Sequence, residues 1–131
     1  MLQHFSRYVA LGDSMSIDLY PALDAGETDV AVALEWNAAA GRVAPLGAVS
    51  LFFGNDDARF PEFAGKDLAS RYPGLTMQNV CEDGATIGDV FGMQLPLVDA
   101  ADVDTLFTVS MGGNDLLSAF ENKQDMAVLT G

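Results

Sequence analysis

Three short runs of apolar residues, well separated along the chain, have the length and composition of buried strands. They cover residues 8–11, 75–81 and 105–111, and the segments between them carry helical patterns. The expected helices cover residues 14–20, which Pro21 would stop, residues 61–72, residues 86–95, which Pro96 would end, and residues 115–120. Because strands that alternate with helices pack as parallel sheets, we expect an α/β protein with a doubly wound parallel sheet.

The connection between the first two strands is about twice the ~30 residues that a strand–helix–strand unit needs. Its surplus, residues 22–60, contains an apolar run over residues 30–34 together with Trp36, Phe52 and Phe53. These side chains are too apolar for a solvated linker, so we expect the segment to cover either the core or a substrate in the active site. The three aromatic residues are candidates for an acyl pocket, and core packing is at least as good an interpretation.

The length and composition of the chain predict a single globular domain over residues 1–131. Half of its residues are hydrophobic, and its length accommodates one core rather than two. The formal charge is −13, from 19 acidic against 6 basic residues. This charge disfavours nucleic acids and anionic membranes as partners, and it is compatible with an uncharged or cationic small substrate.

Cysteine and histidine each occur once, as Cys81 and His4. An internal disulfide and a zinc site of Cys and His ligands are therefore out of reach, and we expect neither a metal nor a cofactor. The N-terminal residues contain no signal peptide, and Pro45 and Gly47 interrupt the longest apolar stretch, residues 43–54. We expect a cytoplasmic protein without stable membrane insertion.

Each expected strand runs into a short motif of small polar residues. Ser14 ends a Gly-Asp-Ser turn, Gly84 follows the second strand, and Asn114 lies in a Gly-Gly-Asn-Asp motif after the third. Because ligands bind beyond the carboxyl ends of parallel strands, the three residues can converge on one crevice. Ser14 is the candidate nucleophile for acyl transfer, and the candidate oxyanion hole consists of the Ser14 and Gly84 N–H groups and the Asn114 amide.

Each of these residues also has a purely structural interpretation. Ser14 could be a helix N-cap, Gly84 could supply a backbone conformation that a side chain forbids, and Asn114 could be a turn residue. The adjacent Asp13 and Asp115 are expected to hydrogen-bond the turn backbone rather than to transfer protons. For the serine, glycine and asparagine together, we favour the catalytic interpretation.

The three motifs, in this order, resemble the sequence blocks of the GDSL-type or SGNH hydrolases, a family of serine esterases and lipases. The resemblance implies hydrolysis of carboxylic esters through an acyl-serine, with Ser14 as nucleophile and Gly84 and Asn114 in the oxyanion hole. It also implies a three-layer α/β/α, flavodoxin-like sheet with strand order second–first–third. The family's fourth block, Asp-x-x-His, would lie beyond Gly131, so we expect the front, C-terminally incomplete part of such an enzyme.

A general base for Ser14 is missing from this picture. His4 precedes the first strand and lies more than ~20 Å from Ser14, and carboxylates are too weakly basic for a serine hydroxyl. We therefore predict that this chain alone is inactive and that its unpaired sheet edge promotes self-association. Two alternatives stay open, a catalytically dead homologue that binds a small molecule or acyl group and an inactive fragment of an incomplete gene model.

Overall fold

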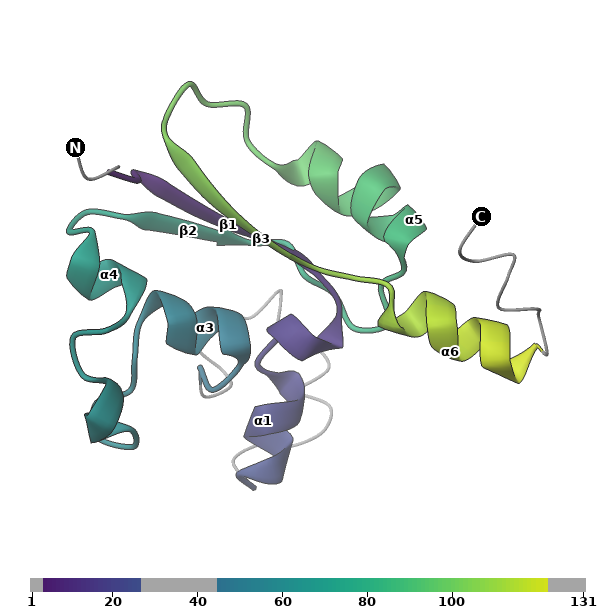
Figure 1. Ribbon diagram of the computed structural model, residues 1–131, viewed down its shortest axis with the longest axis horizontal. Helices are drawn as coiled ribbons and strands as arrows, with labels where there is room; N and C mark the ends of the chain where they lie inside the picture. The colour runs from purple at the N-terminus through teal and green to yellow at the C-terminus, as the bar shows by residue number, and fades with distance from the viewer. Residues whose placement is uncertain (1–3, 27–44, 123–131) are drawn as a thin grey trace.

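A three-stranded parallel sheet forms the centre of the computed structural model, which describes residues 4–26 and 45–122 (Figure 1). The sheet order is β2-β1-β3, with β1 (Arg7–Gly12) between β2 (Thr76–Asn79) and β3 (Thr105–Ser110). Both pairings are parallel. The α/β class and the central position of the first strand, both predicted from the sequence, are confirmed.

The central strand is buried on both faces of the sheet. Tyr8 and Ala10 point into the larger hydrophobic cluster, and Val9 and Leu11 point into a smaller cluster on the opposite face, where they meet Val90. This alternation follows from the two-residue period of a strand. A parallel strand between two others has no solvated face, and this explains why residues 8–11 form a continuous apolar run.

Helices cover both faces of the sheet (Figure 1). On the face of Tyr8 lie η1 (Ser14–Ser16), α1 (Leu19–Asp24), α3 (Ala48–Phe53), η3 (Pro61–Phe63) and α4 (Leu68–Arg71). The other face carries α5 (Ile87–Asp89), which continues into η4 (Val90–Gln94) and η5 (Leu95–Leu97). α6 (Gly113–Glu121) follows β3 and extends away from the sheet. No helix within the described ranges is long and apolar enough to cross a membrane.

The helices deviate from the predicted ones mainly at proline and glycine. Pro21 does not stop a helix but lies in the first turn of α1, where its missing N–H costs nothing. Residues 61–72 do not form one helix, since Gly65, with a φ of +71°, separates η3 from α4. Pro96 lies inside η5 rather than after the preceding helix, and α6 begins earlier than predicted because Gly112 caps it with a φ of +103°.

The described part of the long connection covers the core. Val49 of α3 is buried in the cluster of Tyr8, Phe53 packs against the same cluster, and Phe52 meets the Tyr8 ring edge-on at 5.8 Å between centroids. Trp36 and the apolar run over residues 30–34 lie outside the described residues. The expectation that residues 22–60 cover the active site therefore stays a prediction. The helix α3, in contrast, packs on the core.

Candidate active site

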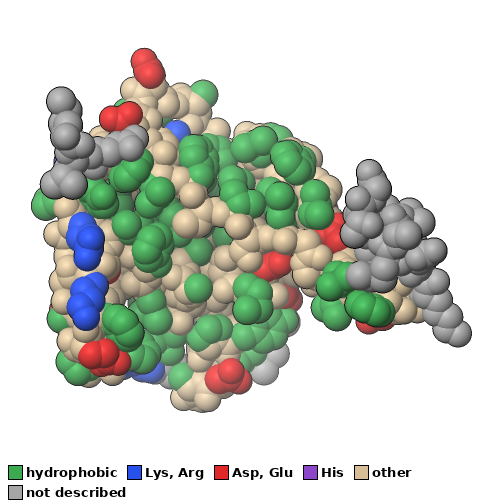
Figure 2. All heavy atoms as spheres, viewed as in Figure 1, with side chains coloured by type: hydrophobic (Ala, Val, Ile, Leu, Met, Phe, Trp, Pro, Cys, Tyr) green, Lys and Arg blue, Asp and Glu red, His purple; other side chains and the backbone are tan. Residues whose placement is uncertain are grey.

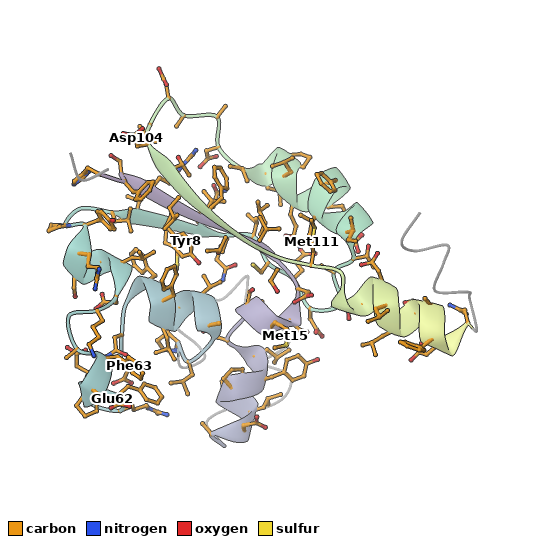
Figure 3. The ribbon with its side chains drawn as sticks, viewed as in Figure 1. Tyr8, Met15, Glu62, Phe63, Asp104 and Met111 are labelled. Carbon is orange, nitrogen blue, oxygen red and sulfur yellow. The ribbon has the colours of Figure 1, made fainter. Side chains whose placement is uncertain are left out.

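The three motif-bearing segments meet at the carboxyl edge of the sheet. Gly12, at the end of β1, pairs with Ser110 at the end of β3. The Asp13 N–H donates to the Ser110 carbonyl at 3.0 Å, and on the other side the Glu82 N–H donates to the Gly12 carbonyl at 3.0 Å. Figure 3 shows Met15 and Met111 together at this end of the sheet, whereas Asp104 lies at the opposite end.

Asp13, and not Ser14, caps the short helix that follows β1. The Asp13 carboxylate accepts from the Met15 N–H at 3.1 Å, so Ser14 is the first residue inside η1. The interpretation of Ser14 as an N-cap is therefore wrong, and the expected backbone role of Asp13 is confirmed. Ser14 is half-buried, and the structure thus leaves its hydroxyl free of the capping role that serine commonly has after a strand.

Gly12 allows the chain to turn tightly between the end of β1 and Ser14. Its φ is +149°, and a Cβ at this position would lie 2.2 Å from the Ser110 carbonyl oxygen. Any other residue would have to push β3 away from β1, because real Cβ atoms do not approach backbone oxygens so closely. The conformation of the Gly-Asp-Ser turn therefore requires a residue without a Cβ at Gly12, where β1 and β3 approach each other.

Contacts from both sides hold the loop that carries Gly84. Tyr20 of α1 donates from its hydroxyl to the Asp83 carboxylate at 3.1 Å, and this hydrogen bond raises the pKa of the Tyr20 phenol. From the side of α6, the Asn114 side-chain amide donates to the Ala85 carbonyl at 2.9 Å. Gly84 itself is exposed and has a φ of +75°, which confirms that the turn needs a glycine.

Asn114 lies in the first turn of α6 rather than in a free turn. One of its two amide N–H groups is used on the Ala85 carbonyl, so the other is the one that can face an oxyanion. The next residue, Asp115, accepts from the Ile87 N–H at 3.0 Å, so it bonds backbone as expected, but at the start of α5 and not in its own turn. The structure therefore joins the Asn114 segment directly to the Gly84 segment.

Gln94 is a residue of this region that the sequence analysis missed. Its side chain is 1% exposed, and its amide brackets Gly12, accepting from the Gly12 N–H and donating to the Gly12 carbonyl, both at 2.8 Å. β2 ends opposite Ala10, so the Gly12 N–H extends past its neighbouring strand and would otherwise be an unpaired buried donor. The side chain of Gln94 takes the place of the missing strand.

The backbone around Gln94 is itself unusual. Val90–Gln94 form a π-helix, a geometry that occurs mostly as single turns inside α-helices and frequently at functional sites. Val90, at the start of this turn, packs on Val9 and Leu11 of β1, while Gln94 reaches the end of the same strand. The π-helix thus presents both an apolar and a polar side chain to β1.

Neither of the other reactive side chains supplies a base or a second nucleophile here. His4 is exposed, stacks edge-on against Tyr72 with 6.0 Å between ring centroids, and precedes β1, whereas Ser14 follows it. Burial raises the pKa of the Cys81 thiol to about 12, so at neutral pH it is the protonated, unreactive form. Within residues 4–26 and 45–122, no group of three or more His, Cys, Asp or Glu side chains could hold a metal ion.

In comparisons with protein-family models, curated proteins and solved structures, the chain matches none of them. The assignment of the site therefore depends on its own geometry and on the three sequence motifs.

Proposed function

We propose that this chain is the nucleophile-bearing part of an SGNH-type serine hydrolase that acts on carboxylic esters through an acyl-serine at Ser14. One observation carries the proposal: the Asn114 amide is hydrogen-bonded to the loop of Gly84, at the same sheet edge as the turn of Ser14. Helices on both faces of a parallel sheet support the corresponding three-layer fold.

Each group has a definite task in this proposal. The Ser14 hydroxyl attacks the ester carbonyl, and the N–H groups of Ser14 and Gly84, with the second N–H of Asn114, hold the oxyanion that forms. Each such donor is worth about 2.7–4 kcal/mol of transition-state stabilisation. Asp13 and Gly12 act on the backbone of the turn, since Asp13 caps η1 and Gly12 permits its approach to β3.

The proposal needs a general base that these residues do not supply, because the single histidine, His4, lies at the wrong end of β1. In the SGNH family this base comes from an Asp-x-x-His block. Without the histidine, a Ser-His-Asp hydrolase loses on the order of 10⁶ in kcat. We therefore expect the 131-residue chain to show no measurable esterase activity by itself.

Chemical rescue tests the role of Ser14 on the chain as it is. Imidazole supplies the missing base from solution, and p-nitrophenyl acetate is the acyl donor. We expect imidazole to stimulate p-nitrophenol release and acetylation of the intact protein beyond the reaction of imidazole alone. Ser14→Ala should abolish this excess, and Ser16→Ala, in the same short helix, should preserve it.

The same assay applies to the chain translated to the end of its native reading frame. We expect that protein to hydrolyse p-nitrophenyl acetate and butyrate without imidazole, and Ser14→Ala to remove the activity. If neither the rescued chain nor the extended protein shows Ser14-dependent turnover, the esterase proposal is wrong, and a binding module at the same crevice becomes the better hypothesis.

A further inference from the structure

A pocket unrelated to the serine turn lies where the end of α3 meets residues 59–67. Its volume is about 340 Å³, which is within the range of small-molecule sites. Figure 3 shows Glu62 and Phe63 in this corner of the molecule, well apart from Met15 in the serine turn. The residues that line the pocket are Leu51, Phe52, Asn55, Phe60, Phe63, Lys66 and Asp67.

The walls of the pocket are mainly aliphatic and aromatic. Leu51 and Phe52 come from α3, and Phe60 and Phe63 come from the segment around η3. Phe52 and Phe63 keep 46% and 53% of their surface exposed. Large apolar side chains that face a common hollow favour a ligand with an apolar body.

Lys66 is the charged group available to such a ligand. Its ammonium lies 5.6 Å from the centroid of the Phe63 ring and donates to the Glu62 carbonyl at 2.8 Å. An ammonium has three N–H donors, so this bond leaves two of them. The other charged lining residue, Asp67, is already engaged, because its carboxylate accepts from the N–H and hydroxyl of Ser70 and caps α4.

Half of the basic residues of this acidic chain lie in or beside the segment that lines the pocket. Of the 6 basic residues in the chain, Arg59, Lys66 and Arg71 fall within residues 55–71, which also hold Asp56, Asp57, Glu62 and Asp67. Arg59 forms an ion pair with Asp56 at 3.4 Å, and Lys66 is the basic residue that lines the pocket. Figure 2 shows Lys and Arg side chains at the edge of the molecule that carries α4. Since charges more than about 8 Å away are largely screened at physiological salt, the ammonium of Lys66 acts on a ligand in this pocket more strongly than the overall charge of −13 does.

We propose that this pocket is a binding site for a small amphipathic carboxylate. The hydrocarbon body lies against Leu51, Phe52, Phe60 and Phe63, and the carboxylate meets the ammonium of Lys66. The pocket does not include Ser14, so the test of this binding site is independent of the test of the proposed esterase activity.

Decanoate and decanol, which differ only in the head group, test the proposal by calorimetric titration below the micellar concentration. Lys66→Gln should weaken decanoate binding about 2- to 5-fold, the range expected for a solvent-exposed ion pair, and leave decanol binding unchanged. Arg71→Gln removes a neighbouring positive charge outside the pocket lining and should change neither affinity. An equal effect of Lys66→Gln and Arg71→Gln on decanoate would overturn the assignment of Lys66.

A pocket-filling variant tests where the hydrocarbon binds. Leu51→Trp should weaken both ligands at least tenfold. Independently of any variant, decanoate added to the unmodified ¹⁵N-labelled protein should shift the amide resonances of the lining residues and not those of β3. Undiminished binding to a folded Leu51→Trp protein, or shifts centred on β3, would show that the ligand binds elsewhere and that the proposal is wrong.

Discussion

Replacing Gln94 by methionine removes both polar atoms that bracket Gly12 while keeping a side chain of similar length. The Gly12 carbonyl retains its bond from the Glu82 N–H, but the Gly12 N–H loses its acceptor, the Gln94 Oε1. A buried donor left without an acceptor costs about 1–3 kcal/mol, and the lost bond to the carbonyl adds about 0.5–1.5 kcal/mol. We expect Gln94→Met to lower the free energy of unfolding by about 1.5–4.5 kcal/mol.

Gln78 offers a matched control, because its amide also bonds to backbone on both sides. Its Nε2 donates to the Leu97 carbonyl at 2.8 Å and its Oε1 accepts from the Asp99 N–H at 3.4 Å, but at the surface. Water replaces these bonds after Gln78→Met, so this variant should cost less than about 1 kcal/mol. Urea unfolding followed by circular dichroism, at one protein concentration, gives both values. Equal losses for Gln94→Met and Gln78→Met would refute the argument.

Gln94→Glu adds a pH-dependent arm to the same experiment. A protonated glutamic acid can bracket Gly12 as the amide does, with its O–H donating and its C=O accepting, whereas the carboxylate cannot donate. Burial raises the pKa of a carboxyl group, so the folded variant favours the protonated form, and its stability is greatest below the ordinary glutamate pKa. The deficit of Gln94→Glu relative to the unmodified protein should therefore be small near pH 4 and grow as the pH rises.

Two further predictions concern the sheet edge and an acid-sensitive cap. β3 is an outer strand of the described sheet, with Val109 53% exposed, so we expect concentration-dependent association in light scattering. Val109→Lys should reduce this association, and a monomer at all concentrations would contradict the prediction. Burial raises the pKa of Asp67, but the bonds from Ser70 outweigh it and the net pKa is lowered. The cap's contribution is therefore complete above the ordinary aspartate pKa and is lost as the pH falls through the lowered value. Asp67→Asn, which caps without titrating, should flatten this part of the thermal stability profile between pH 5 and pH 2.

The strands and the positions of the motif residues were predictable because their signals are local. A continuous apolar run identified β1 as a strand buried on both faces, and the small polar residues after each run marked the carboxyl edge of the sheet. The same local signals failed for helix boundaries. The sequence pattern predicts a stop at Pro21, although a proline fits the first turn of a helix as well as the position after one.

Gln94 was not predictable in the same way, because its role depends on how strands of different lengths align. The Gly12 N–H needs an acceptor from Gln94 because β2 ends opposite Ala10, whereas β1 continues to Gly12. One signal was present in the sequence. Gln94 follows Val90 by four residues, so a helix would place this polar side chain on the same face as a core valine.

The pairing of β1 also has a consequence for the synthesis of the protein. Arg7 donates from its guanidinium to the Thr105 hydroxyl across 98 residues of sequence, and Gly12 pairs with Ser110. At about 5–20 residues per second, the ribosome takes about 5–20 s to make β3 after β1. The most apolar strand is thus the first to be made and the last to be enclosed. During this interval it is a target for chaperones and for neighbouring nascent chains, so translation speed between β1 and β3 should affect the yield of folded protein.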